Sequence, residues 1–471
     1  MQHMPSGKPR RRSHKFRPIQ GAIFAGNSPL YFAERTDILS TTRPRRAPAD
    51  FGLGSDPMDY DELLDLTVDL AFQLQQCGAE TYRVEEAIVR LLGAYGVQGA
   101  AFSIPGCIIV SLETAEEKHM TRMCRSAYSS TDLDGIERYS GLCRRICQEK
   151  PPVQEAIAMV QAEKQAAKSY RFPILLLGYF LAAAGFSIFF RGTMLDALCA
   201  GLSGLATGLC LYFMNKLHAN LFFKTVAAGF VLALLAHGLA IAGLAHNVDA
   251  AIIGALMLLV PGLLFTNSIR DIIYGDTMSG VNRLVQVLIT AVALAVGTGA
   301  AMTLARQLWG DLAGSGALVQ YGLFMQCFAG FVGSLGFCLL LNLHGPGMFL
   351  CIAGGILSWL AYRLCSYLGM SDITAFFLSA ATISAYAEIM ARVRKCPATS
   401  YLLVALFPLV PGADIYYTMD YAVRGNTDAF LQYGLHTGAI AGALAVGILL
   451  VSTTFRMWGV WRHRRKQPQV P

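Results

Sequence analysis

The chain has 471 residues, of which 54% are hydrophobic and 15% are charged, and its mean hydropathy is +0.45. This composition is too apolar and too poor in charge for an ordinary soluble protein, so we expect much of the chain to lie in lipid. We interpret most of the formal net charge of +7 as an orientation signal for membrane helices, and it does not suggest nucleic-acid binding.

Residues 1–57 are rich in Arg, Pro, Gly and Ser and show no sustained hydrophobic periodicity. We therefore expect this basic extension to be disordered. The functional alternative is a basic arm that touches anionic membrane lipid. A second alternative is that translation begins at Met58, where the first ordered element starts.

Residues 58–170 are predicted to form a compact cytoplasmic domain of the α/β or α+β type. Apolar residues recur at helical spacing before and after Gly78-Ala79, which predicts two amphipathic helices with a short connection. The stretch VQGAAFSIPGCIIVSLET (97–114) predicts a β-hairpin with a Pro-Gly turn, and HMTRMCRS (119–126) predicts a third short strand. Two further helices, near 132–148 and 152–167, lead to the membrane.

The second of the two amphipathic helices, which follows Gly78-Ala79, opens with a charged motif that includes Glu80, Arg83 and Glu85. We expect this motif to make a gating or sensing contact with the membrane part. The alternative is helix capping and packing, since acidic groups suit the positive end of a helix. A hydrolase is not expected, because no Ser/His/Asp set, metal-ligand spacing or phosphate loop accompanies the acids.

Ten charge-poor windows follow from residue 172, each about as long as the roughly 20 apolar residues that span a bilayer. They lie near 172–190, 194–214, 222–244, 249–268, 281–305, 317–342, 347–368, 372–391, 400–418 and 429–454. The second five windows follow the first five by about 150 residues, which indicates an internal duplication. The predicted fold class is a mostly α-helical polytopic membrane protein, with about ten transmembrane helices in a 5+5 inverted repeat.

We place the two repeats at residues 171–306 and 315–456, followed by a basic cytoplasmic tail at 457–471. The loops and helix ends that this arrangement puts in the cytoplasm hold Lys216, Lys224, Arg270, Arg283, Arg392, Arg394 and Lys395, whereas the outer ones hold Arg191, Arg306, Arg363 and Arg424. Lys and Arg accumulate in cytoplasmic loops. The sequence thus predicts a multi-pass protein of the cytoplasmic (inner) membrane with both termini in the cytoplasm.

A Pro-Gly step interrupts two of the windows, at Pro261-Gly262 and at Pro411-Gly412, 150 residues apart. Proline removes a backbone donor and glycine permits unwinding, and a helix that restarts after a break points its positive end at an anion. Each break falls slightly past the middle of a hydrocarbon core about 30 Å thick. We predict that the breaks face each other near the midplane and frame the substrate site; the alternative is that each only kinks a packed helix.

Polar residues near the breaks are the other candidates for binding substrate or ion. Asp414 is assigned proton or substrate-ammonium binding, because a carboxylate inside the membrane is costly; a buried structural hydrogen bond is the alternative. Asn267, Arg270 and Asp271 follow the first break, where Arg270 and Asp271 are interpreted as a gate pair or a carboxylate clamp, against a plain cytoplasmic ion pair. Asp276, at the end of the same segment, is included in the predicted site.

Three further residues of the membrane windows are candidates for substrate binding or proton relay. Glu388 is a candidate for the site, although Arg392 stands one helical turn away and the two are also expected to pair with each other. His237 and His436 lie in apolar windows and have a side chain suited to proton relay. A lone histidine in a helix is nevertheless more often a satisfied core residue, and we favour that reading for both.

The stretches GAETYRVEEAI (78–88), VPGLLFTNSIRDIIYGDTMSG (260–280) and AEIMARVRKCPATSYLLVALFPLVPG (387–412) together resemble the threonine/serine exporter (ThrE-like) family. The resemblance covers residues 58–456. It implies a cytoplasmic domain joined to a ten-helix membrane part that exports small amino acids, threonine or serine, with coupling to protons. A small dicarboxylate such as succinate is the alternative substrate, and a channel or sensor is the alternative class.

Neither an enzyme nor a cofactor is expected. The twelve cysteines are scattered singly, without the spacing of a metal site. The expected partners are the small-molecule substrate, the proton and membrane lipid, with a homo-oligomer left open.

Overall fold

The computed structural model describes residues 59–125, 131–310 and 318–466. The expectations for residues 1–57 and for residues 467–471 of the tail lie outside these described residues. The chain divides into one unit that ends at Met58 and one that begins at Asp59.

The first part of this unit contains four helices and three strands. They are α1 (Tyr60–Gln76), α2 (Thr81–Ala94), β1 (Gln98–Ile104), β2 (Cys107–Glu113), β3 (His119–Arg125), α3 (Leu133–Glu149) and α4 (Val153–Gln165). Helices α1 and α2 are joined through Gly78, whose φ of +84° is a left-handed conformation that glycine adopts without strain. The tight joint places Glu80 at the N-cap of α2.

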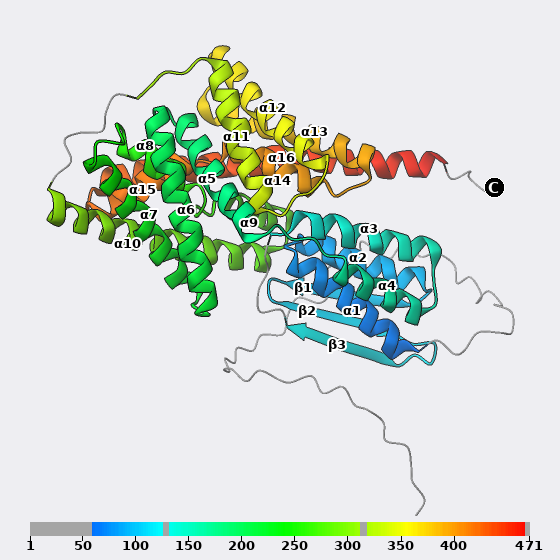
Figure 1. The fold of residues 1–471 in the computed structure, drawn as a ribbon. Coiled ribbons are helices and arrows are strands. Elements are labelled where there is room, and N and C mark those ends of the chain that lie inside the picture. Colours follow the sequence, from blue (N-terminus) through cyan, green and yellow to red (C-terminus); the bar gives the residue numbers. More distant parts are fainter. Residues whose placement is uncertain (1–58, 126–130, 311–317, 467–471) are drawn as a thin grey trace, which may run out of the picture. The chain divides into compact units, whose positions relative to one another are not determined.

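The three strands form one antiparallel sheet in the order β1-β2-β3. Side chains alternate between the two faces of a strand, and on β2 the residues Ile108, Val110 and Leu112 are buried against the helices, whereas the other face exposes Phe102 and Met123. Figure 1 shows the helices gathered over one face of this sheet. A sheet with one covered face explains the alternating pattern of the strands.

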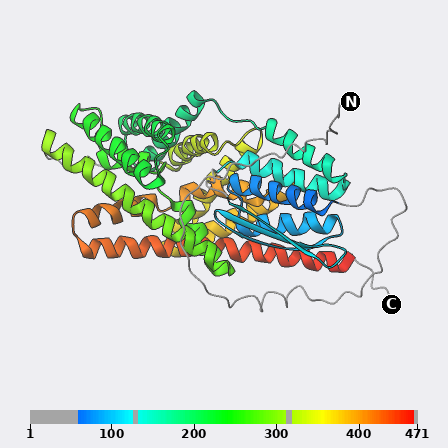
Figure 2. The same cartoon turned by 90° about the horizontal axis from the view of Figure 1, so that it is seen from below.

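The remainder of the unit is helical. Its elements are α5 (Phe172–Phe189), α6 (Met194–Lys216), α7 (Leu221–Ile241), α8 (Val248–Leu256), α9 (Gly262–Tyr274), α10 (Thr277–Trp309), α11 (Leu323–Leu340), α12 (Gly347–Tyr367), α13 (Asp372–Arg394), α14 (Ala398–Leu406), the 3-10 helix η1 (Phe407–Leu409), α15 (Gly412–Val423) and α16 (Thr427–Lys466). Figure 2 shows the two longest of them, α10 in green and α16 in orange to red, running through the bundle. The helix α16 continues ten residues past the expected end of the second repeat, through a stretch of Arg and Lys that favours the helical state.

Within the described residues, eight helices are long and apolar enough to cross a membrane. The number rises to nine if the pair Ala398–Leu409 and Gly412–Ala422, bent by 56°, is one span. The protein is thus a multi-pass membrane protein, but the expected count of ten is not reached. The reason lies in the fourth window, which is divided into α8 with 9 residues and α9 with 13 residues, and α9 also carries Arg270 and Asp271.

Helices α5 and α11, which occupy the first position in the two halves, pack tightly against each other. A methyl group added at Gly185 would lie 2.4 Å from the backbone nitrogen of Gly333, and one at Gly178 would lie 3.1 Å from the carbonyl oxygen of Gly336. Residue numbers rise along α5 as they fall along α11, so the two helices are antiparallel. Glycine at these points permits the close approach of two backbones.

Other helix pairs recur in both halves. Helix α7 packs against α10 as α13 packs against α16, and the short helices α9 and α15 each contact both α10 and α16. The two short helices that follow the Pro-Gly steps are therefore enclosed by the two longest helices of the bundle.

Candidate functional site

The two Pro-Gly steps meet inside the bundle. A methyl group added at Gly262 would lie 2.1 Å from Cγ1 of Val410, and one added at Gly412 would lie 2.2 Å from Sδ of Met257. Gly262 thus packs against the side chain of Val410, just before the second break, and Gly412 packs against the side chain of Met257, shortly before the first break. We call this reciprocal contact, made by Met257, Gly262, Val410 and Gly412, the crossing.

The irregular backbone at the crossing is shielded by protein. Met257, Phe407 and Val410 are all buried, with at most 7% of each residue exposed. Backbone that leaves the helical ladder is tolerated at membrane depth only where protein or a water-filled cavity surrounds it. Helices α9 and α15 both begin at the crossing, so their first N–H groups, which have no intrahelical partner, lie there.

A cavity of about 240 Å³ lies where α2, α9, α13, α14 and α16 come together. Its lining combines carboxylates (Glu80, Glu86, Asp271, Asp276, Glu388), guanidinium groups (Arg83, Arg270, Arg392, Arg456) and hydroxyl groups (Tyr82, Ser384, Thr399, Ser452, Thr453). We call it the first cavity. It brings together charges of both signs within a space that is otherwise walled by apolar helices.

A buried ion cluster forms one wall of the first cavity. The guanidinium of Arg270 lies 2.5 Å from Glu80 and 3.7 Å from Asp271, and Arg283 lies 2.7 Å from Asp271. The side chains of Glu80, Arg270 and Asp271 are each less than 10% exposed. In addition, Thr81 donates to Ser279 over 3.4 Å. The ion pair joins the start of α2 to α9, 190 residues later in the chain.

Glu80 is held ionised by its neighbours. Burial by itself raises the pKa of its carboxyl group, but the charges of Arg270 and then Arg83 outweigh burial and lower the pKa below the ordinary value of 4.5. A lowered pKa in the folded state stabilises the protein at every pH above the ordinary value, and this contribution is lost as the pH falls through the lowered value.

The lowered pKa of Glu80 can be tested by thermal unfolding of the wild-type protein and of Glu80→Gln between about pH 7 and about pH 3. The wild type is expected to have the higher melting temperature above pH 4.5, and the difference is expected to shrink as the pH falls. A difference that stays constant over this range would contradict an ionised Glu80.

Another part of the lining of the first cavity is suited to an anion. The hydroxyl of Thr399 is buried, has no hydrogen-bond partner among the described residues, and lies in the first turn of α14. The N–H groups and the positive dipole end of a helix N-terminus attract anions. Arg456 lies nearby and stacks over the ring of Tyr82 at 5.8 Å, while Glu388 pairs with Arg392 over 2.6 Å.

A second cavity, of about 300 Å³, is lined by Phe190, Asn247, Asp249, Ala250, Ile253, Leu318, Ala413 and Tyr417. On the α8–α9 segment the second cavity touches residues that precede the break at Pro261, such as Asp249 and Ile253. The first cavity touches residues that follow this break, namely Arg270 and Asp271. On the α14–α15 segment the order is reversed, since Thr399 lines the first cavity and Ala413 the second. The two cavities therefore lie on opposite sides of the crossing along both broken segments.

The predicted site residues fall into three groups. Glu80, Arg83, Arg270, Asp271, Asp276 and Glu388 line the first cavity, and Pro261, Gly262, Pro411 and Gly412 make the two breaks at the crossing. Asn267, Asp414 and Glu85 line neither cavity. The carboxylate of Glu85 accepts a hydrogen bond of 2.9 Å from the backbone N–H of Ser103 and ties α2 to the sheet, and Asp414 contacts His436 at 3.0 Å.

Several lining residues were not predicted, among them Ser384, Thr399, Ser452 and Arg456. A local signal exists for most of them, because Ser384 precedes Glu388 by one helical turn and Ser452 precedes Arg456 by one turn. Residues four apart share one face of a helix, so polar pairs at this spacing in apolar helices mark the wall of a cavity. Thr399 carries no such partner in the sequence.

Apolar helices that pass through a membrane, two breaks that meet inside the bundle and a cavity on each side of them define this chain as a membrane transport protein. A family model described as "Putative threonine/serine exporter" matches residues 65–305. A second model, described as "Threonine/Serine exporter, ThrE", matches residues 326–454. The chain belongs to the threonine/serine exporter family, with both parts in one polypeptide.

Two curated relatives agree with this assignment. The chain is similar to a threonine/serine exporter of Corynebacterium glutamicum, with 24% identity over 71% of this chain and 68% of the relative. It is also similar to a probable threonine/serine exporter of Mycobacterium tuberculosis, with 22% identity over 84% of this chain and 77% of the relative. No solved structure matches the chain.

Proposed function

We propose that this protein exports threonine, serine or a similar small amino acid across the cytoplasmic membrane in exchange for protons. The observation that carries the proposal is the first cavity, which is lined by charges of both signs and several hydroxyl groups. At neutral pH an amino acid is a zwitterion, and it needs a partner for its carboxylate and another for its ammonium group. The family membership supports the same substrate class.

The geometry of the cavity suggests how a zwitterion is oriented. The carboxylate is assigned to the hydroxyl of Thr399 and the N-terminus of α14, with Arg456 contributing positive charge. The ammonium group is assigned to Glu388 and Asp276 on neighbouring walls. The cavity, of about 240 Å³, has room for a small amino acid.

The proposed transport cycle uses the crossing as the barrier between the two cavities. The antiparallel packing of α5 against α11 and the recurrence of helix pairs support a 5+5 inverted repeat, in which two halves rock against each other about a fixed point. The positive-inside distribution supports both termini in the cytoplasm, and the first cavity then opens to the cytoplasm and the second to the outside. Substrate enters the first cavity, the crossing separates, and the second cavity releases it.

The first part of the unit has a defined place in this proposal. Because α2 supplies Glu80, Tyr82, Arg83 and Glu86 to the first cavity, residues 59–170 act as a cytoplasmic cap. The ion pair between Glu80 and Arg270 holds the cap on the cavity. Access of the substrate from the cytoplasm then requires this pair to loosen.

Efflux from proteoliposomes tests the proposal. Vesicles that contain the purified full chain are loaded in parallel with labelled threonine, serine and succinate, and efflux is measured with and without an acidic exterior. Threonine and serine are expected to leave faster under the gradient. The variant Thr399→Val, which keeps the shape and removes the hydroxyl, is expected to raise the KM for export about tenfold, since a hydrogen bond to a charged group contributes about 1.5–3 kcal/mol.

The matched control is Thr303→Val, because the hydroxyl of Thr303 donates to Gly299 within α10 and does not line either cavity. It is expected to export at the wild-type rate. Movement of succinate alone, or unchanged KM in Thr399→Val, would overturn the assigned substrate or its orientation.

A further inference from the structure

His436 lies between two carboxylates that come from two other helices. Its ring nitrogen Nδ1 lies 3.0 Å from Oδ2 of Asp414 on α15, and its Nε2 lies 3.4 Å from Oδ2 of Asp372 on α13. The other oxygen of Asp372 accepts a hydrogen bond of 2.5 Å from the hydroxyl of Tyr362 on α12. Residues from four helices thus form one connected polar chain. None of these four residues lines the first cavity.

The arrangement offers a place for an additional proton. An ionised carboxylate only accepts hydrogen bonds, whereas a neutral imidazole has one donor and one acceptor nitrogen. A neutral ring can donate from Nδ1 to Asp414, and its Nε2 then carries no hydrogen toward Asp372. A proton added at Nε2 makes the ring a cation between two acids and turns the contact with Asp372 into an ion pair.

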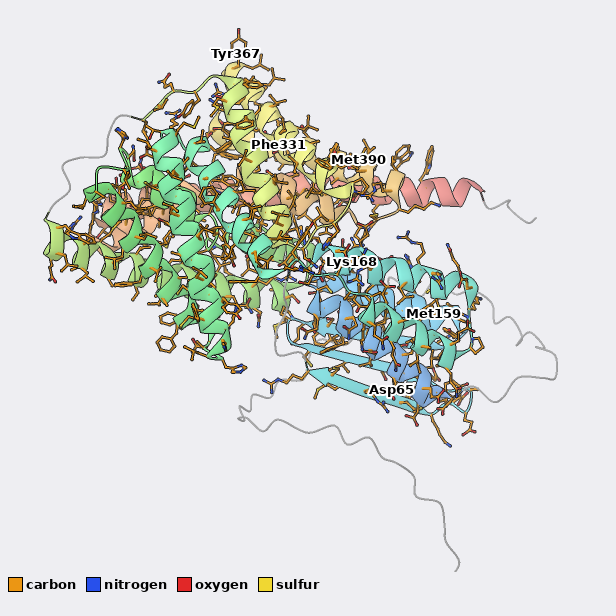
Figure 3. All side chains as sticks on the ribbon, in the orientation of Figure 1. Asp65, Met159, Lys168, Phe331, Tyr367 and Met390 are labelled. Carbon is orange, nitrogen blue, oxygen red and sulfur yellow. The ribbon has the colours of Figure 1, made fainter. Side chains whose placement is uncertain are left out.

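Two of the three titratable side chains are partly exposed at the surface of the bundle. The side chains of His436 and Asp372 are 41% and 43% exposed, whereas that of Asp414 is 22% exposed. Asp372 begins α13 directly after the exposed end of α12, where Tyr367 projects away from the helices (Figure 3). The exposed fraction of the side chain thus falls from Asp372, at the start of α13, through His436 to Asp414, near the break at Pro411.

The other charged and titratable groups around the ring are few among the described residues. Arg363 on α12 is the cation whose charge acts on Tyr362. On α16 itself the preceding turn carries Tyr433, whose ring packs 5.5 Å from that of Tyr417 on α15. We assign the exchangeable proton to the histidine and the two acids, because tyrosine and arginine side chains in general titrate far above neutral pH.

The first half of the chain has no counterpart of this cluster. At the positions 150 residues earlier, Asp414 corresponds to Leu264, His436 to Gln286 and Asp372 to Phe222. None of these three side chains titrates. A feature confined to one half of a repeat is not required by the packing that both halves share.

We propose that Asp372, His436 and Asp414 form the proton-binding site of this transporter, and that a proton bound there drives export of the amino acid. The inference rests on the proposed function and supplies the site for its coupling ion. The proton enters at Asp372, passes to His436 and neutralises Asp414, which lies in the first turn of α15 beside the crossing. A carboxylate at the positive end of a helix stabilises that helix start, so its neutralisation loosens the packing of Gly412 on Met257.

The test uses the full chain in proteoliposomes that contain labelled threonine and an internal pH indicator. In the wild type, an acidic exterior is expected to accelerate efflux and to acidify the interior. The variant His436→Gln, which keeps a donor and an acceptor but cannot titrate, is expected to lose at least about four-fifths of this acceleration. Exchange of internal for external threonine without a gradient is expected to stay within about twofold of wild type.

Two further variants keep this test decisive. Asp372→Asn, at an exposed helix start, is expected to lose most of the acceleration and answers the question if His436→Gln does not fold. His237→Gln is the matched control, because His237 is a membrane histidine that contacts the carbonyl of Ala233 within its own helix α7. Wild-type acceleration in both His436→Gln and Asp372→Asn, or equal loss in His237→Gln, would overturn the proposal.

Failure of the proposed function is recognised separately, because the wild type would then export neither threonine nor serine. In that case the ring signals of His436 in protein with ¹⁵N-labelled histidine, assigned by their absence in His436→Gln, still test the proton site. Ring signals that change with pH, with a different midpoint in Asp372→Asn, support it. Ring signals that do not change with pH overturn it.

Discussion

The substitution Gly262→Ala is expected to abolish export almost completely, with a loss of at least about tenfold in rate. The added methyl group would lie 2.1 Å from Cγ1 of Val410 and within 3.6 Å of its other side-chain carbons. Valine is branched at Cβ and has little freedom to rotate away. Forcing an extra methyl group into a packed site costs about 1–3 kcal/mol, so the crossing cannot close with both side chains in place.

A second substitution is expected to restore function. In Gly262→Ala/Val410→Ala the atom that obstructs the new methyl group is absent, so export should return to within a few fold of wild type, as measured by labelled threonine efflux. Gly412→Ala should be milder than Gly262→Ala, because the atom it meets belongs to the flexible side chain of Met257. Gly438→Ala on α16 is the control, since nothing lies within 4 Å of its added methyl group.

These variants separate a barrier from a simple kink. If each Pro-Gly step only bent its own helix, Gly262→Ala would be tolerated about as well as Gly438→Ala, and Val410→Ala would not rescue it. Strong loss in Gly262→Ala with rescue by Val410→Ala requires that the two breaks act on each other.

Removal of the buried Arg270 charge is expected to produce the largest loss of stability. Arg270→Gln removes from Glu80 and Asp271 a cation whose side chain is only 8% exposed, and it leaves Asp271 with Arg283 and Glu80 with Arg83 at 3.8 Å. Breaking a buried ion pair from one side typically costs about 3–5 kcal/mol, because a buried charge remains uncompensated. We expect a clear drop in melting temperature and, because the cap no longer seats on the first cavity, a loss of threonine export.

The double variant Glu80→Gln/Arg270→Gln is expected to recover part of that stability. The recovered part is the coupling energy of the pair, which a double-mutant cycle measures directly. The control is Arg90→Gln on the same helix α2, where the pair with Glu86 is 55% and 52% exposed and such a pair contributes about 0–1 kcal/mol. Additive effects of the two single changes at Glu80 and Arg270 would contradict a direct contact between the cap and α9.

The elements nearest to the site show how far local patterns reach. Pro261-Gly262 and Pro411-Gly412 identify both broken segments, because proline and glycine impose a backbone break wherever they stand in an apolar helix. The same patterns do not show where a window contains a turn, since a window of mean hydropathy does not register a break in the direction of the chain. The windows near 249–268 and 400–418 are each two short helices, and the first pair does not qualify as a span.

His436 shows the limit of weighing residues singly. As an isolated histidine in an apolar window it is best read as a satisfied core residue, and the acids that contact it, Asp372 and Asp414, stand 64 and 22 positions earlier in the sequence. Only the packing of α13 and α15 against α16 brings the three side chains within 3.4 Å. No spacing rule for a single helix contains that information.

The sequence by itself determined that this is a polytopic helical membrane protein with a charged motif at Glu80 and two Pro-Gly breaks. These properties depend on hydropathy, charge and backbone chemistry, which act over a few neighbouring residues. Only the tertiary structure decided that Gly262 receives Val410, that Glu80 pairs with Arg270 across 190 positions, and that one cavity lies on each side of the crossing. Such contacts arise from the packing of distant helices, whose side chains meet only once the whole bundle has closed.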